Sequence, residues 1–159
     1  MEKDNQRIQK DNVCMERAAG CKEHGAAPLQ EPDMRRLIEA AFQARENSYS
    51  PYSHFRVGAA LLCKEGNIYT GCNIENRAYG PTNCAERTAF FKAVSEGERS
   101  FAAIVIVGGE DEPVWCYPCG VCRQVMAEFC APDEFQIICA KSTDEYRVFT
   151  LSQLLPEMF

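Results

Sequence analysis

The stretch Ala102-Ala103-Ile104-Val105-Ile106-Val107 is an almost uninterrupted apolar run in a chain of 159 residues. Successive side chains of a strand point to opposite faces of a sheet, so a strand that is apolar at consecutive positions is covered on both faces. This run therefore predicts a central strand in the middle layer of the domain.

The segments on either side of this run alternate between helical and extended patterns. Predicted helices span 33–47, 84–96, 119–131 and 151–155, and the other predicted strands span 55–63, 68–74, 135–140 and 146–149. Asp33 is the predicted N-cap of the first helix, and Gly97 is the predicted stop of the second. The order of elements predicts one layered α/β domain with a mixed sheet.

Composition narrows the classes of function. The chain has 17 Lys and Arg against 23 Asp and Glu, a net charge of −6, which disfavours a surface that coats nucleic acid. No apolar run approaches the roughly 20 residues that span a bilayer, and 1–5 lacks the apolar region of a secretory signal. The ten cysteines are then expected to be reduced thiols of a cytoplasmic protein. Residues 1–30 read as a polar, flexible extension before a domain at 31–159.

Two cysteine motifs indicate a metal site, Cys84-Ala85-Glu86-Arg87 and Pro118-Cys119-Gly120-Val121-Cys122-Arg123. Cys119 and Cys122 are three residues apart at the start of a predicted helix, so their side chains share one face. Together with Cys84 they offer three thiolates to one zinc ion. Three protein ligands leave a fourth position open, as in catalytic rather than structural zinc sites.

Glu86 and Arg87 have expected roles beside this site. The Glu86 carboxylate, two residues after Cys84, is placed to accept and return protons at the open position. Three thiolates leave a zinc ion with net charge −1, and Arg87, with Arg123 as a second candidate, is placed to donate to the sulfurs and relieve that charge.

Two other interpretations of the cysteines compete with zinc. Cys116-Tyr117-Pro118-Cys119 is also a C-x-x-C pair, but the opening helix and hairpin do not match a thioredoxin-like order of elements. The three cysteines from Cys116 to Cys122 also suggest an iron–sulfur cluster. The next cysteine is Cys130, however, so the compact fourth ligand of that pattern is missing.

The two motifs together fit the signature of the zinc deaminases, with Cys84 in place of the usual histidine. Over about residues 34–159 the chain resembles the cytidine deaminases of nucleoside salvage, in their small homotetrameric form. The matching segments are 51–55 (PYSHF), 57–61 (VGAAL), 71–76 (GCNIEN), 84–89 (CAERTA), 118–124 (PCGVCRQ) and 154–156 (LLP).

The resemblance implies a fold and a reaction. The expected fold is a three-layer α/β/α sandwich with a five-stranded mixed sheet, and the expected cofactor is one zinc ion per subunit. The implied enzyme is a hydrolase of C–N bonds in cyclic amidines, which converts cytidine and 2′-deoxycytidine to the uridines plus ammonia. The expected assembly is a homotetramer, with no nucleic-acid or membrane partner.

The resemblance also implies roles for individual residues. Glu86 matches the catalytic acid–base that protonates N3 of cytosine and then the departing amine, and Cys84, Cys119 and Cys122 match the zinc ligands. Substrate-binding roles fall on Asn73 and Glu75 (ribose hydroxyls), Phe55 (packing on the pyrimidine), the Ala85 backbone (the base) and Phe159 (a neighbouring subunit's site).

Several alternatives stay open at this stage. A modified cytosine nucleoside such as blasticidin S is a second candidate substrate, although the ribose motif at 73–75 disfavours it. A non-catalytic structural zinc module would need a fourth protein ligand, and nucleic-acid editing would need a basic channel. Trp115, Cys116 and Tyr117 depart from the family pattern beside Pro118, with an effect that the sequence does not define.

Overall fold

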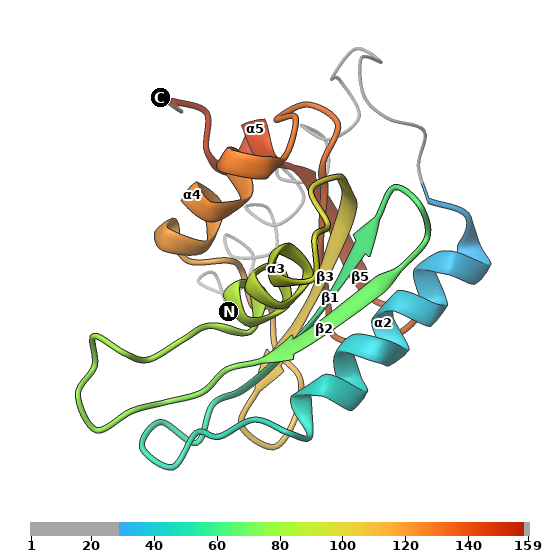
Figure 1. Ribbon diagram of the computed structural model, residues 1–159. Helices are drawn as coiled ribbons and strands as arrows, with labels where there is room; N and C mark the ends of the chain where they lie inside the picture. Colours follow the sequence, from blue (N-terminus) through green and yellow to red (C-terminus); the bar gives the residue numbers. More distant parts are fainter. Residues whose placement is uncertain (1–28, 158–159) are drawn as a thin grey trace, which may run out of the picture.

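The computed structural model describes residues 29–157 and contains one five-stranded sheet between two layers of helices (Figure 1). The strands are β1 (Arg56–Cys63), β2 (Ile68–Cys72), β3 (Phe101–Gly109), β4 (Gln136–Ala140) and β5 (Tyr146–Thr150). The helices are α2 (Glu31–Arg45), α3 (Ala85–Ser95), α4 (Gly120–Phe129) and α5 (Leu151–Leu154). The expected α/β/α sandwich is confirmed.

The sheet has the strand order β2-β1-β3-β4-β5 and is mixed. β1 is antiparallel to both β2 and β3, β3 is parallel to β4, and β4 is antiparallel to β5. The parallel pair needs a crossover connection, and α4 supplies it. β3 lies in the middle of the sheet and is buried at every position from 103 to 109, as its apolar run predicts.

The core is divided by the sheet into two layers. Alternate residues of β3 belong to different layers, because Ile104 and Ile106 pack with α3 and α4 whereas Val105 and Val107 pack with α2. In Figure 1, α2 accordingly lies on the opposite side of the sheet from α3 and α4. This arrangement leaves the first turns of α3 and α4 on the same face.

Two strand glycines set how closely the helices approach the sheet. A Cβ atom on Gly58 would lie 2.0 Å from the carbonyl oxygen of Ala41 in α2. On the other face, a Cβ atom on Gly71 would lie 2.4 Å from the carbonyl oxygen of Ala85 in α3. Backbone atoms cannot rotate out of such a contact, so any larger residue would push the helix away.

Two local expectations differ from the structure. The N-cap of α2 is Gln30 rather than Asp33, because the helix begins earlier, with a proline in its first two positions, and places Asp33 in its first turn. Strand β2 ends at Cys72, two residues before its predicted end, and Ile74 continues only through isolated bridges to Tyr49 and Asn83.

The remaining boundaries agree with the predicted elements to within a few residues. Residues 1–28 and 158–159, and with them most of the predicted extension and Phe159, lie outside the described residues. No helix within 29–157 has the length and apolar character that crossing a membrane requires.

Replacing Gly58 by Ala should lower the free energy of unfolding by about 3 kcal/mol, because overpacking against helix backbone displaces α2. Gly80→Ala is the matched control, since a Cβ atom there meets nothing within 4 Å. Chemical denaturation of both variants measures the difference. Equal stability of the Gly58 variant and the parent protein would contradict this packing account.

Candidate active site

Two helices begin at the site with a cysteine as the N-cap. Cys84 is the N-cap of α3 and Cys119 is the N-cap of α4, and neither side chain makes the capping hydrogen bond that Ser, Thr or Asp makes at this position. Both sulfur atoms are therefore left for another partner. The free N–H groups of two first turns and two helix dipoles also favour negative charge at this point.

The three predicted zinc ligands lie together. The Sγ atoms of Cys84, Cys119 and Cys122 all lie within 4.8 Å of one another. The sulfur of Cys119 is 3.8 Å from that of Cys84 and 3.6 Å from that of Cys122. Sulfurs bound to a tetrahedral zinc ion at about 2.3 Å are separated by about 3.8 Å. The donor set and its spacing thus fit zinc.

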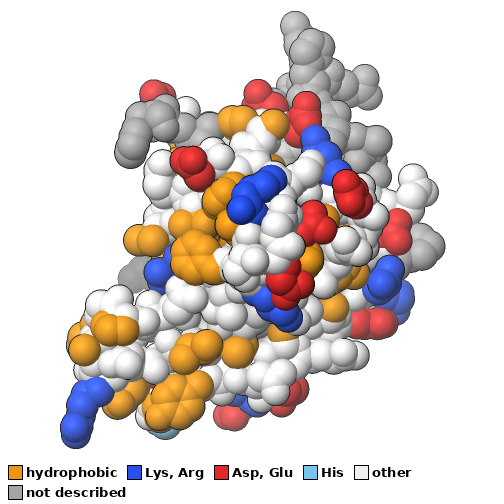
Figure 2. Space-filling view, in the orientation of Figure 1, with side chains coloured by type: hydrophobic (Ala, Val, Ile, Leu, Met, Phe, Trp, Pro, Cys, Tyr) orange, Lys and Arg blue, Asp and Glu red, His pale blue; other side chains and the backbone are white. Residues whose placement is uncertain are grey.

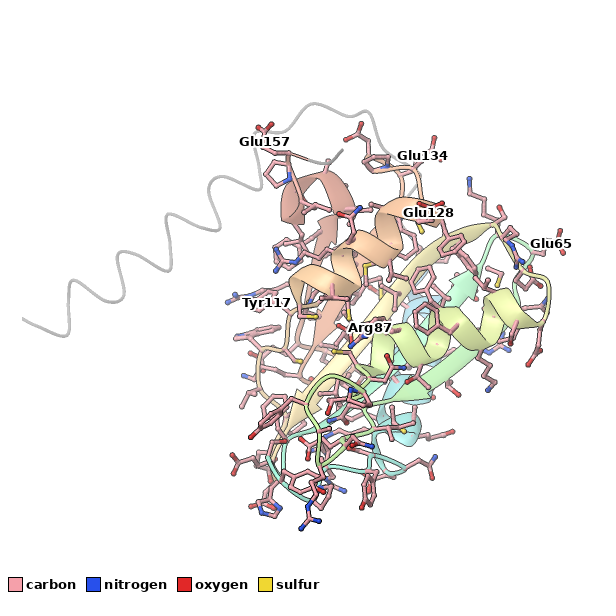
Figure 3. All side chains as sticks on the ribbon, turned by 60° about the vertical axis from the view of Figure 1, so that its left-hand side comes forward. Glu65, Arg87, Tyr117, Glu128, Glu134 and Glu157 are labelled. Atoms are coloured by element: carbon pink, nitrogen blue, oxygen red, sulfur yellow. The ribbon has the colours of Figure 1, made fainter. Side chains whose placement is uncertain are left out.

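Arg87 contacts this cluster through the sulfur of Cys84. Its guanidinium lies 3.5 Å from the sulfur of Cys84 and donates to the carbonyl oxygen of Thr82 at 3.2 Å. Figure 3 shows Arg87 between the first turns of α3 and α4, beside the sulfur atoms. Nε of Arg87 is buried without a partner among the described residues, so a further donor is present at the site.

Arg123 does not share this role. Its side chain donates to the carbonyl oxygens of Pro118 and Leu154, at 2.8 and 2.6 Å. It therefore ties the start of α4 to the end of α5. These bonds of Arg123 go to carbonyl oxygens and not to the three sulfurs, so they do not support its expected role in relieving the charge of the sulfurs.

The surroundings of Cys84 favour a thiolate. Hydrogen bonds from Cys122 and then from Arg87 lower the pKa of the Cys84 thiol to about 5, against the opposing effect of burial. The pKa of Cys122 is raised, because its thiol makes the bond to Cys84 and is buried. In turn the bond to Cys84 raises the pKa of Arg87, whose cation persists next to the sulfurs.

Glu86 is a buried carboxylate beside the three sulfurs. It lies in the first turn of α3 and is 4% exposed, one of two buried charged residues in the described chain together with Arg45. Loss of solvent raises the pKa of its carboxyl to about 7, and the charge of Cys84 acts in the same direction. A carboxyl group of this pKa can both accept and donate a proton near neutral pH.

Asn73 turns its side chain toward β1. Its amide accepts from the backbone N–H of Val57 at 2.8 Å and from the hydroxyl of Ser48, and it donates to the carbonyl oxygen of Phe55 at 2.8 Å. One of the two amide N–H groups is thereby used. Asn73 thus fixes the start of β1.

Glu75 lies in a pocket of about 200 Å³ lined by Tyr52, Ser53, Glu75, Asn76, Tyr79 and Thr82. Its carboxylate accepts from the Ser53 hydroxyl and from the backbone N–H of Tyr52 and Ser53. These bonds lower the pKa of Glu75, so the group is an anion at neutral pH. Asn73 and Glu75, to which the resemblance gives ribose-binding roles, both bond to residues of the segment 48–57.

The carbonyl oxygen of Phe55 accepts from the Asn73 amide, and Ala85 directly follows Cys84. Phe55 directly precedes β1, and its ring edge would lie 3.1 Å from a Cβ atom on Gly108. The sulfur of Cys116 would lie 2.8 Å from the same Cβ atom. Ala85 is fully buried as the first residue of α3, directly after Cys84.

The segment before Pro118 contains a stack of side chains. The Arg147 guanidinium lies 4.1 Å from the centre of the Trp115 ring and donates to the Tyr117 hydroxyl at 2.8 Å. Figure 3 shows Tyr117 next to the start of α4. Burial raises the pKa of the Cys116 thiol between them to about 12, which is the opposite of a reactive redox cysteine.

An α/β/α domain with three thiolates at two helix N-termini and a buried glutamate beside them has the parts of a zinc-dependent deaminase. The comparison with protein families agrees. A family model described as the cytidine and deoxycytidylate deaminase zinc-binding region matches residues 32–139. The chain belongs to this family.

Individual relatives point in the same direction. A cytidine deaminase from Halalkalibacterium halodurans is 52% identical over 127 residues, which cover 80% of this chain and 94% of the relative. The crystal structure of cytidine deaminase from Burkholderia pseudomallei aligns with a TM-score of 0.71 at 48% identity, covering 78% of this chain and 97% of that one. A blasticidin-S deaminase from Bacillus cereus is more distant, at 32% identity over 76% of this chain and 87% of the relative.

Replacing Cys84 by Ala should remove zinc from the purified protein, because two sulfurs remain where the site needs three. Cys72→Ala is the control, since Cys72 bonds to the carbonyl oxygen of Asn47 and lies outside the three-sulfur cluster. The measurement is zinc per chain by elemental analysis, with circular dichroism to verify the fold. A folded Cys84 variant with one zinc per chain would contradict the assignment.

Proposed function

We propose that the protein is a zinc-dependent deaminase that hydrolyses cytidine and 2′-deoxycytidine to uridine and 2′-deoxyuridine, with release of ammonia. One observation carries this proposal: a glutamate that is 4% exposed lies beside three sulfurs spaced for zinc. Membership of the deaminase family supplies the class of substrate.

Cys84, Cys119 and Cys122 are the residues proposed to hold zinc. A zinc ion supplies Lewis-acid activation of a water molecule for attack on an electron-poor ring carbon. The cluster found in the described chain has three members, so it leaves one coordination position open. A closed structural site would need a fourth protein ligand.

Glu86 is proposed to move the protons of the reaction. Deamination at C4 of cytosine requires a proton to leave water, a proton to reach N3 of the ring, and another to reach the departing amine. A carboxyl group with a pKa of about 7 can take and give each of these protons near neutral pH. Burial also keeps bulk water from competing for them.

Asn73 and Glu75 are proposed to bind the ribose hydroxyls. Glu75 is held as an anion by Tyr52 and Ser53 and lines a pocket, so it can accept from a hydroxyl group. Asn73 keeps one N–H that no described residue accepts, which can donate to a ribose oxygen. A nucleoside with an ordinary ribose fits these groups better than blasticidin S does.

The base is proposed to pack on Phe55 and to bond with the backbone of Ala85. Phe55 directly precedes β1 and its carbonyl oxygen accepts from the Asn73 amide, and Ala85 directly follows the proposed zinc ligand Cys84. Arg87 is proposed to offset the charge of the three thiolates, supported by its contact with the sulfur of Cys84. Without such a donor, an anionic centre would be a weaker Lewis acid.

A homotetramer is proposed as the working assembly, with Phe159 reaching the site of a neighbouring subunit. The support is an exposed apolar surface that includes Tyr79, Phe91 and Val121, which are 88%, 48% and 58% exposed. Figure 2 shows hydrophobic side chains over α3, α4 and the connection that leads into α3.

Cytoplasmic localisation is proposed as well, because the eight cysteines in the described chain are all free.

Replacing Glu86 by Gln should reduce deamination of cytidine by at least about a thousandfold, because the amide keeps the size of the side chain but cannot carry the protons. Zinc per chain should be unchanged. The assay follows the ultraviolet spectrum of cytidine, 2′-deoxycytidine and blasticidin S with parent and variant. Glu96→Gln, in a residue outside the site, is the control, and robust turnover by the Glu86 variant would refute the proposed function.

A further inference from the structure

The connection from β2 to α3 joins the two halves of the proposed site. It contains Asn73 and Glu75 at its start and runs into Cys84, and in Figure 1 it extends away from the helices as a long loop. A long loop by itself would not hold the groups proposed for ribose in register with the groups proposed for catalysis. The hydrogen bonds of the described residues show what fixes it.

The two ends of this loop pair with each other as a short antiparallel ladder. Ile74 and Asn83 exchange both backbone hydrogen bonds, each 2.9 Å long. One step further along, the N–H of Asn76 donates to the hydroxyl of Thr82 at 3.1 Å. Ile74 is the residue between Asn73 and Glu75, so this ladder ties the ribose segment to the residue directly before Cys84.

Thr88 locks the ladder onto α3. The side-chain amide of Asn83 donates to Thr88 Oγ1 at 3.0 Å. The same oxygen lies 3.0 Å from the carbonyl oxygen of Cys72 and 3.1 Å from the carbonyl oxygen of Cys84. Its one proton is donated toward these two carbonyl oxygens. Thr88 therefore contacts the last residue of β2, the residue before the zinc ligand and the zinc ligand itself.

We propose that Asn83 and Thr88 are positioning residues that set the register between the ribose-binding pair Asn73 and Glu75 and the catalytic pair Cys84 and Glu86. This inference rests on the proposed function. Neither Asn83 nor Thr88 is among the residues proposed to hold zinc or to bind the substrate. They determine how well the enzyme uses the ribose hydroxyls to place C4 of the base at the reacting position.

The expected consequence concerns substrates that differ only in their hydroxyls. Cytidine can bond to Asn73 and Glu75, whereas 2′,3′-dideoxycytidine lacks both hydroxyls and gains nothing from the register. Thr88→Val keeps the shape of the side chain and removes the hydroxyl that holds Asn83. The ratio of kcat/KM for cytidine to kcat/KM for 2′,3′-dideoxycytidine should fall at least tenfold in this variant, with zinc per chain retained.

Three further variants make the test specific. Thr88→Ser should restore the ratio to within about threefold of the parent value, because the hydroxyl returns. Asn83→Ala removes the other partner from a half-buried loop position, and should lower the ratio even if the Val variant fails to fold. Thr70→Val makes the same chemical change on β2, away from this network, and should leave the ratio unchanged.

Each outcome distinguishes the inference from the function on which it rests. A parent enzyme that does not deaminate cytidine would refute the proposed function. A parent enzyme that is active, with Asn83 and Thr88 variants that lose both activities in equal proportion or lose neither, would overturn the positioning role. Loss of zinc from folded variants would also overturn it, because the residues would then act on the metal site alone.

Discussion

The site depends on the meeting of the first turns of α3 and α4 on one face of the sheet. Three sulfurs can share a zinc ion only if the two N-caps, Cys84 and Cys119, come within about 4 Å of each other. Their distance follows from the packing below them. β3 is buried on both faces, and Gly71 lets α3 approach the sheet until their backbones touch. A change in either layer would therefore reach the metal site.

Electrostatics at this point work in opposite directions on neighbouring residues. The hydrogen bonds to Cys84 lower the pKa of its thiol, whereas burial raises the pKa of Glu86, two residues away. One group is thus prepared to bind a cation and the other to exchange protons. Arg87 lies 3.5 Å from the sulfur of Cys84, where its positive charge is proposed to offset that of the three thiolates.

Much of this arrangement could be predicted from the sequence, because it depends on local patterns. The apolar run at 102–107 predicts the central strand, and the spacing of Cys119 and Cys122 predicts two sulfurs on one helix face. The position of Asp33 shows the limit of such patterns. An acidic residue is favourable both as an N-cap and in the first turn, and here the chain places it in the first turn.

Contacts between distant segments could not be predicted in the same way. The resemblance implies a ribose-binding role for Asn73, but it does not indicate that the side-chain amide also bonds to the backbone of Phe55 and Val57 at the start of β1. Thr88 lies in the matched segment 84–89, but the sequence indicates no role for it or for Asn83, because their bonds join groups that only the fold brings together. The stack of Arg147 on Trp115 likewise joins β5 to the segment before α4.

The most direct test of the account is X-ray absorption at the zinc edge of the zinc-loaded protein. Three thiolates and an open position predict three sulfur atoms at about 2.3 Å and one oxygen or nitrogen atom at about 2.0–2.2 Å. Four sulfur atoms around the metal would contradict the account, because a fourth cysteine would then close the position at which the reaction is proposed to occur.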